Sequence, residues 1–352
     1  LDNTVGNYWF GADSFPLVND IKWTKMYLHQ NGTVDKSKPT SDEGYKIYVH
    51  DPNYPVLTIG GANMIVRTPL DDGNSQGQMD LADSRYDSLT MNRPGVVKFV
   101  SAAITEANGY PGDSLCIIGF PVATLYAKSS PGGVIDGPTD TDFFIRILDV
   151  YPDGRELFVV EGCVNARARD YARNLVEHPE WDNTFPYFND NTPFTNIEIG
   201  QIYEYKFKMM PIAYVWGAGH KIKILISSSN YTRYQVNPNL PIEPGDFFRR
   251  KPGDGRKYTF EGVEMEPRIA VQRIAFSDVY PTNIDLPVFM GLNSGIEETN
   301  IKTEKLDALI YPNPASDNIS IYMNRTGIFE ITLFNILGQV VLNTEFEGDI
   351  NI

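Results

Sequence analysis

The sequence is poor in the residues that build metal centres, disulfide frameworks and nucleic-acid contacts. Its 352 residues include 2 cysteines and 4 histidines, and 30 basic residues stand against 45 acidic ones, for a net charge of −15. Cys116 and Cys163 lack the paired short spacing of a structural zinc site, so we expect both to be small buried side chains. Because contacts to phosphate require clustered cations, the acidic balance argues against a nucleic-acid partner.

Long apolar runs are also missing. The longest nearly apolar stretch, residues 117–127, is interrupted by Gly119 and Pro121 and is shorter than the roughly 18 residues that a membrane helix needs. We therefore expect no membrane span. The chain begins with Leu1 and shows no charged segment followed by an apolar one, so we interpret it as a fragment that lacks an upstream part.

The sequence is rich in alternating apolar and polar residues, punctuated by 29 glycines and 24 prolines. Residues 203–209 place aromatic and aliphatic side chains on one face and charged ones on the other, and residues 143–147 and 221–226 repeat the pattern. Such period-two patterns are typical of half-buried antiparallel strands. Tyr151–Gly154 has the residues of a hairpin turn, and residues 167–177 are the one candidate helix before residue 290. The body of the chain is thus predicted to be a β-sandwich.

The pattern changes near residue 290. Residues 291–308 are polar and show no sustained alternation, which is typical of a linker. Short strands resume from residue 309, but too few follow to close a sandwich before the chain stops, which predicts a truncated second unit. The predicted domains are therefore residues 1–290 and 309–352, joined by the linker.

Candidate catalytic groups are weak. Gly73–Gly77 satisfies the Gly-x-Ser-x-Gly pattern of serine hydrolases around Ser75, but both flanks are polar, whereas a nucleophile elbow needs a buried strand before it and a helix after it. A surface turn is the better interpretation. The histidines lack the spacing of a zinc peptidase, and we expect them to be satisfied or solvent-facing side chains. They are His29, His50, His178 and His220.

Two binding roles are weighed against simpler alternatives. Asp136, Asp140 and Asp142 could hold calcium, but the dense alternation of a calcium loop is missing, so solvated turn carboxylates are the default and no metal site or cofactor is predicted. A set of aromatic residues could form a sugar-stacking platform, although core packing is favoured because aromatic side chains dominate sandwich interiors. These residues are Tyr8, Trp9, Trp23, Trp181, Phe185 and Tyr187.

Four segments in a fixed order, Tyr48–Gly61, Thr139–Gly154, Ala166–Asp170 and Gly219–Asn239, extend over about 190 residues. Together they resemble the C-terminal jelly-roll domain of the CocE/NonD hydrolases, which include cocaine esterase, α-amino-acid ester hydrolases and X-Pro dipeptidyl-peptidases. The resemblance implies a galactose-binding-like jelly roll. It also implies that the catalytic serine, aspartate and histidine lie in an upstream α/β-hydrolase domain with a helical cap.

The resemblance further implies a supporting role for this domain, which packs on the catalytic and cap domains and helps to shape the substrate pocket. The segment after Gly61 is expected to approach that pocket, so Met64, Ile65 and Val66 are candidate apolar lining residues. From the residues themselves, we expect Asp140 and Asp142 to cap backbone amides or to pair with Arg167 or Arg169. The hydroxyls of residues 227–229 are expected to bond backbone groups where the chain leaves the sheet.

Residues 309–352, through the strings Tyr311–Ile321 and Phe334–Val341, resemble the C-terminal sorting domain of type IX secretion cargo in Bacteroidetes, a small Ig-like sandwich that is only partly present. The resemblance implies export across the outer membrane by the type IX machinery, to the cell surface or the medium. One hypothesis is therefore the non-catalytic part of a secreted serine hydrolase acting on acyl esters or X-Pro dipeptides. The other is a free-standing secreted β-sandwich module that binds a glycan or a surface ligand.

Overall fold

The computed structural model describes Phe15 and residues 20–59, 79–135, 137–177, 193–242, 251–255, 257–290, 308–311, 320–323, 328–334, 340–347 and 350–351. The chain forms two compact units, Leu1–Ser294 and Gly295–Ile352.

The first unit is built mainly from strands. In chain order these are β1 (Ile21–Leu28), β2 (Thr33–Asp35), β3 (Gly44–His50), β4 (Val96–Ser101), β5 (Leu115–Gly119), β6 (Val122–Pro131), β7 (Pro138–Thr139), β8 (Asp142–Val150), β9 (Glu156–Asn165), β10 (Ile197–Glu198), β11 (Tyr203–Lys208), β12 (Ile212–Trp216), β13 (Lys221–Ser227), β14 (Tyr258–Phe260), β15 (Val263–Met265), β16 (Ala270–Phe276) and β17 (Asn283–Phe289). The α-helices are α1 (Ser84–Thr90) and α2 (Arg169–Glu177), and short 3-10 turns cover Glu106–Asn108, Pro111–Asp113 and Ala166–Ala168.

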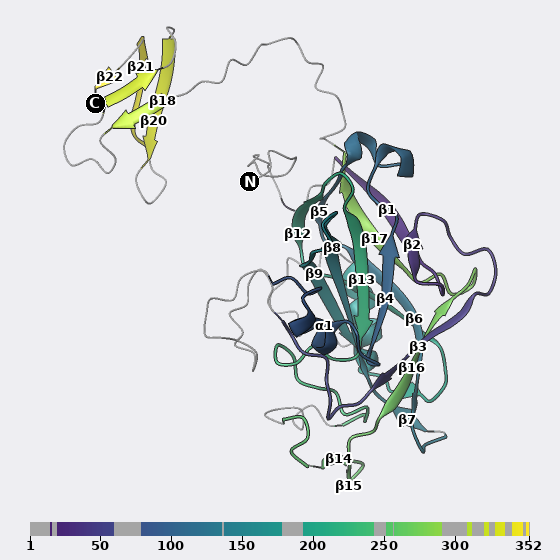
Figure 1. Ribbon diagram of the computed structural model, residues 1–352. Coiled ribbons are helices and arrows are strands. Elements are labelled where there is room, and N and C mark those ends of the chain that lie inside the picture. The colour runs from purple at the N-terminus through teal and green to yellow at the C-terminus, as the bar shows by residue number, and fades with distance from the viewer. Residues whose placement is uncertain are drawn as a thin grey trace. The chain divides into compact units, whose positions relative to one another are not determined.

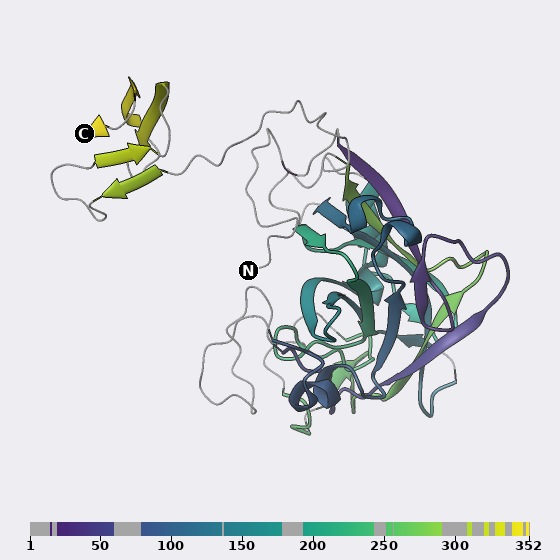
Figure 2. The ribbon, with the colours of Figure 1, turned by 45° about the horizontal axis from the view of Figure 1, so that its top comes forward.

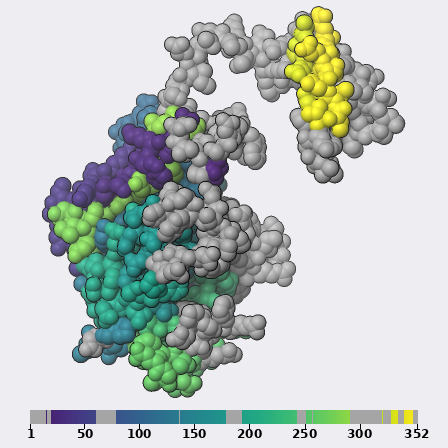
Figure 3. Space-filling view, turned by 180° about the vertical axis from the view of Figure 1, so that it is seen from behind, coloured from purple at the N-terminus to yellow at the C-terminus, as the bar shows by residue number. Residues whose placement is uncertain are grey.

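The strands form a sandwich of two layers (Figures 1 and 2). Hydrogen bonds connect the main sheet in the order β3-β16-β6-β17-β1-β2-β4-β13-β8-β9, with β11 on β6 and β5 bridging β12 and β17. The three-residue strand β2 pairs antiparallel with β1 and parallel with β4, and so connects the layers. Strands distant in sequence adjoin: β1 pairs with β17, and in Figure 3 purple N-terminal residues lie beside light-green residues near 280.

The core lies between the layers. Phe99 of β4 packs against Phe276 of β16 with ring centroids 5.6 Å apart, and Phe143 of β8 packs against Tyr205 of β11 at 4.7 Å. These rings belong to one large cluster of buried side chains that spans both layers. Each fully buried aliphatic or aromatic side chain contributes about 1.5–3 kcal/mol before the entropy of ordering is subtracted. The all-β sandwich predicted from the sequence is confirmed.

The expectation that each strand has one solvated face is confirmed for β11, where the core side chains Tyr205 and Phe207 alternate with half-buried neighbours. It is wrong for β8 and β13, which are buried on both faces. A second apolar cluster covers their outer face: Leu148 and Leu225 pack there against the segment before residue 60 and against α1. The seven-residue helix α1 was not predicted, because it is too short to show a helical apolar stripe.

Other local predictions had mixed outcomes. The hairpin at Tyr151–Gly154 is confirmed between β8 and β9, with Gly154 at φ +94°, and α2 occupies most of the predicted helix. Cys116 is buried as expected, whereas Cys163 is exposed, because it points away from the core between the buried Gly162 and Val164. Trp23 is 53% exposed rather than packed in the core, since Met26 and Leu28 occupy the inward face of β1.

The second unit contains β18 (Ala308–Tyr311), β19 (Ser320–Met323), β20 (Ile328–Phe334), β21 (Val340–Glu347) and β22 (Ile350–Asn351). β19 lies between β18 and β22, and β20 pairs with β21 as an antiparallel hairpin. Phe329 and Phe346 face each other across this hairpin, with ring centroids 5.7 Å apart. Within the described residues of the chain, no helix has the length and apolar character that a membrane-spanning helix requires.

The backbone of β9 approaches that of Met209 so closely that only glycine fits at position 162. A Cβ atom there would lie 2.8 Å from Met209 Cγ and 2.9 Å from Met209 Cα. We predict that Gly162→Ala lowers the free energy of unfolding by about 1–3 kcal/mol, because overpacking forces backbone atoms apart. Urea denaturation measures the change.

Gly217→Ala is the matched control for this prediction. A Cβ at position 217 would meet its nearest neighbour, His220, at an ordinary contact distance of 3.7 Å. Equal stability of the two variants would contradict the proposed close approach at Gly162.

Candidate functional site

The segment that leads to residue 60 is fixed to the strand exit after β13. Leu57 forms a parallel bridge with Tyr231, and the Tyr231 N–H donates to the Val56 carbonyl at 2.9 Å. The Val56 N–H donates to Ser229 Oγ at 2.9 Å, while Ser227 Oγ donates to the Ser229 carbonyl at 3.0 Å. The prediction that these hydroxyls bond backbone groups is therefore confirmed for Ser227 and Ser229.

A buried carboxylate lies behind this attachment. Asn230 Nδ2 donates to Glu161 Oε2 at 2.6 Å, and Arg233 Nη1 lies 2.7 Å from Glu161 Oε1. Thr58 Oγ1 in turn donates to Asn230 Oδ1 at 2.7 Å. Burial raises the pKa of Glu161, while the nearby guanidiniums of Arg233 and Arg146 oppose that rise. The chain is thus tied from Thr58 through Asn230 to a charge inside the sheet.

The chain that follows residues 60–78 is held at a second place, where Asp80 and Leu81 bond to the start of β9. Asp80 Oδ1 accepts the backbone N–H of Glu156 at 2.9 Å and that of Ala82 at 3.0 Å. The Leu81 N–H donates to the Glu156 carbonyl at 2.9 Å, and the Leu81 side chain is buried in the second apolar cluster. Both attachments are therefore made to the layer of the sandwich that contains β13, β8 and β9.

Sequence reasoning did not find Glu161 or its partners. A charged residue within the largely apolar stretch 159–164 of β9 was the available signal, because an acid in such a stretch needs a buried partner. The predicted pocket residues Met64, Ile65 and Val66 lie outside the described residues, as does Ser75.

A second polar cluster joins three segments near the start of β8. Asn165 Nδ2 donates to Asp142 Oδ1 at 2.8 Å and to Asp140 Oδ2 at 3.0 Å, and Asn237 Nδ2 lies 3.0 Å from both of these oxygens. Arg167 Nε donates to Asp140 Oδ2 at 3.2 Å, which confirms the predicted pairing with Arg167.

The alternative partner, Arg169, is used elsewhere. Its guanidinium donates to the carbonyls of Ala166 and Thr195 and lies over the ring of Tyr203.

The two amides of this cluster are oriented by the backbone. Asn165 Oδ1 accepts the Arg167 N–H at 3.1 Å, and Asn237 Oδ1 accepts the Asn239 N–H at 2.9 Å, so the NH₂ group of each amide must face the carboxylates. Calcium requires oxygen ligands, and here donors occupy those directions. Within the described ranges, no group of three or more His, Cys, Asp or Glu side chains could hold a metal ion. Asp136, the third predicted member, lies outside them.

The two carboxyls of this cluster share an environment that favours protonation. Burial raises the pKa of Asp142 to about 7, and the neighbouring Asp140 charge adds to the rise, whereas the two amides and Arg167 oppose it. Burial also raises the pKa of Asp140, against the effect of Arg167. The geometry therefore suits a pair of carboxyls that holds one proton near neutral pH.

Each of the three described histidines has a polar partner on one ring nitrogen. His29 Nδ1 lies 2.8 Å from Glu43 Oε1, and the buried His50 Nε2 lies 3.1 Å from the Asn237 carbonyl, with burial lowering its pKa to about 4. His220 Nδ1 lies 2.8 Å from Asp149 Oδ1, the orientation that a catalytic imidazole has in a triad. Within the described residues, however, no hydroxyl or thiol is hydrogen-bonded to its Nε2 atom. His178 lies outside them.

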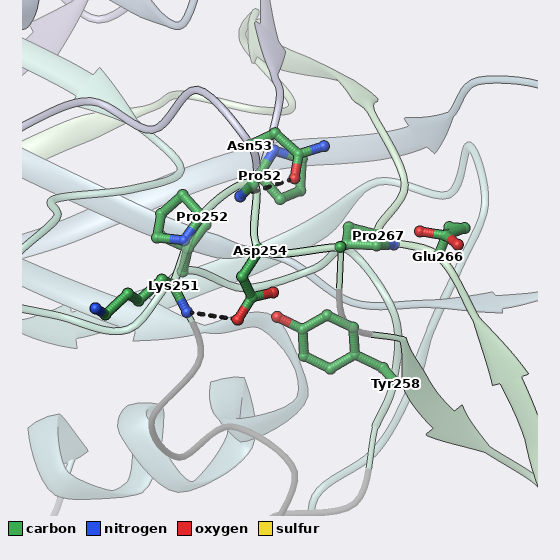
Figure 4. Close-up of a pocket in the computed structure, with 11 residues that line it drawn as sticks. Pro52, Asn53, Lys251, Pro252, Asp254, Tyr258, Glu266 and Pro267 are labelled. Atoms are coloured by element: carbon green, nitrogen blue, oxygen red, sulfur yellow. Dashed lines mark hydrogen bonds between the residues drawn. The ribbon is translucent and has the colours of Figure 1, made fainter.

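A pocket of about 220 Å³ opens between the loop after β3 and the loops around β14 (Figure 4). Its lining residues are Pro52, Asn53, Val236, Lys251, Pro252, Gly253, Asp254, Gly255, Tyr258, Glu266 and Pro267. The Lys251 N–H donates to Asp254 Oδ2 at 3.2 Å, and Asn53 Oδ1 accepts the Gly253 N–H at 3.2 Å. The polar side chains of this lining are carboxylates, an amide, an amine and a phenol, which can bind a polar ligand. They do not include a serine, cysteine or histidine that could act as a nucleophile or its base.

The carboxyl pair makes stability depend on pH. The folded state keeps a proton that the unfolded state loses above its ordinary pKa of 3.8, so the free energy of unfolding falls as pH rises towards about 7. We predict that Asp142→Asn flattens this dependence by up to about 1.4 kcal/mol per pH unit. Urea denaturation between pH 4 and pH 8 measures it.

Asp278→Asn is the control for this prediction, because Asp278 is exposed. Parallel pH profiles for the wild type and Asp142→Asn would show that the pair holds no additional proton.

Comparison with known proteins agrees with both resemblances. Residues 2–276 match the X-Pro dipeptidyl-peptidase C-terminal non-catalytic domain, and residues 309–352 match the secretion system C-terminal sorting domain. Cocaine esterase from Rhodococcus sp. (strain MB1 Bresler) is 27% identical over 288 residues, which are 80% of this chain and 40% of the esterase. The resemblance to the C-terminal jelly-roll domain of the CocE/NonD hydrolases is thereby confirmed.

A solved structure shares the fold. The aminopeptidase from a marine sediment Thaumarchaeota archaeon superposes with a TM-score of 0.53 at 19% identity, over 76% of this chain and 37% of the aminopeptidase. The chain therefore spans less than half the length of these relatives. Since the first family match covers most of the chain, the chain belongs to the family of X-Pro dipeptidyl-peptidase C-terminal non-catalytic domains.

Proposed function

We propose that this chain is the non-catalytic C-terminal part of a secreted CocE/NonD-type serine hydrolase, which cleaves acyl esters or X-Pro dipeptides with a serine, an aspartate and a histidine located upstream. The match of residues 2–276 to a non-catalytic domain carries the proposal. The similarity to cocaine esterase covers 40% of that enzyme, which supports a catalytic region located outside this chain.

In this proposal residues 1–290 form the jelly-roll domain, which packs on the α/β-hydrolase and cap domains and shapes the substrate pocket through Met64, Ile65 and Val66. The fixed attachments on either side support this role. Thr58 is held through Asn230, and Asp80 holds the start of β9, so a segment between them starts and ends at rigid positions. Fixed ends reduce the ordering cost of placing side chains against a substrate.

Residues 309–352, after a linker at 291–308, act in this proposal as the address for the type IX secretion machinery. The match to a secretion system sorting domain supports export to the cell surface or the medium.

A free-standing binding module is the second candidate. The exposed Trp23 favours it, because an exposed indole can stack on a sugar ring. The upstream coding sequence distinguishes the two candidates. A Gly-x-Ser-x-Gly between a strand and a helix supports the hydrolase, whereas a signal peptide ending near Leu1 supports the module.

We predict that the purified chain hydrolyses p-nitrophenyl acetate no faster than buffer, because the reacting groups lie upstream, and that Ser75→Ala leaves this rate unchanged. Co-expression with the upstream region should give a serine-dependent rate well above that of buffer. The absorbance of released nitrophenolate measures the rates of the isolated chain, of Ser75→Ala and of the co-expressed protein. Turnover by the isolated chain that is lost in Ser75→Ala would overturn the proposal.

A further inference from the structure

The outer face of β3, β16 and β6 presents two cations side by side. Ile47, Arg273 and Lys128 are directly opposite one another in the register of these three antiparallel strands, which lie together in Figure 1. Lys128 Nζ lies 4.4 Å from the centroid of the Tyr45 ring. Within the described part of the chain, neither Arg273 nor Lys128 forms an ion pair with a carboxylate.

This arrangement is unexpected in so acidic a chain. Like charges directly opposite each other across strands are destabilising, and 45 acidic residues were available to compensate 30 basic ones. The acid on the adjoining strand, Glu204, is already engaged: it accepts from Tyr126 Oη at 2.6 Å and lies 3.4 Å from Arg173 Nε. The two cations therefore remain available to an anion from outside the described chain.

Tyrosines border the cations on the same face. Tyr126 is two residues from Lys128 on β6 and packs against Tyr280, with ring centroids 5.6 Å apart. Tyr45 lies on β3 two residues from Ile47, which is 54% exposed. We name the set Tyr45, Tyr126, Lys128, Arg273 and Tyr280 the basic sheet face.

We propose that the basic sheet face binds a carboxylated polysaccharide, a chain of sugars that includes uronic acids. Arg273 offers a planar fork that pairs with a carboxylate through two N–H groups, and Lys128 adds a second charge beside it. The tyrosine rings offer amphipathic surfaces for the C–H faces of sugar rings. The proposal goes beyond the proposed hydrolase and concerns where an exported protein attaches.

The same observations disfavour an acidic polypeptide as the partner. An acidic polypeptide could satisfy the cations, but it would not require the tyrosine pair. The tyrosines therefore provide the test that separates a saccharide from a peptide.

Isothermal titration calorimetry with oligogalacturonate tests the proposal on the purified chain at low salt. Binding is expected for the wild type, with Kd raised at least tenfold in Lys128→Glu and in Arg273→Glu, and raised several-fold in Tyr280→Ala. Lys221→Glu is the matched control, because Lys221 is an exposed cation on β13, and it should leave Kd unchanged. Circular dichroism confirms that each variant is folded.

Three outcomes would overturn the proposal. They are the absence of binding to oligogalacturonate, binding that both charge reversals retain, and equal affinity for poly-glutamate that is insensitive to Tyr280→Ala. The last outcome would assign the face to acidic polypeptides. Binding to the carboxyl-reduced oligosaccharide should be lost, since the uronate carboxylates provide the charge that Arg273 recognises.

Discussion

The buried carboxylate of Glu161 is the constraint on which the candidate site depends. A carboxylate that is removed from water costs several kcal/mol unless donors replace the lost hydration. Asn230 and Arg233 supply those donors, and they can do so only if the chain after β13 turns back over β9. That turn places Asn230 beside Thr58, so the need to satisfy one charge also fixes the position from which residues 60–78 depart.

Much of the architecture could be predicted, because it is encoded locally. Period-two alternation identified β11, and turn chemistry located the hairpin at Tyr151–Gly154. The two-sided burial of β8 could not be predicted in this way, because α1 and the segment before residue 60 cover it from elsewhere in the chain. The same limit applies to the site. Asn230 and Glu161 are 69 residues apart, so their pairing depends on topology that no local pattern contains.

The polar clusters differ in what they do for the protein. Glu161 is held by Asn230 and Arg233 and fixes the position of the chain after β13. Asp140 and Asp142 have one cation, Arg167, between two acids, so their charge changes with proton binding. The Asn165 and Asn237 amides hold this pair in place in either state, because the backbone fixes their orientation. The described part of the chain thus uses buried ionisable side chains in two ways, for position in one case and for proton binding in the other.

The contact between Gly162 and Met209 has a consequence for the edge of the main sheet. β9 ends the path of the main sheet, and an uncovered terminal strand is a template for pairing with other chains. Here the neighbouring Met210 N–H donates to the Glu161 carbonyl at 3.0 Å, and the closeness that glycine permits brings this donor into range. At this position the last strand is thereby paired with the chain's own backbone, so the Glu161 carbonyl is not open to pairing with another chain.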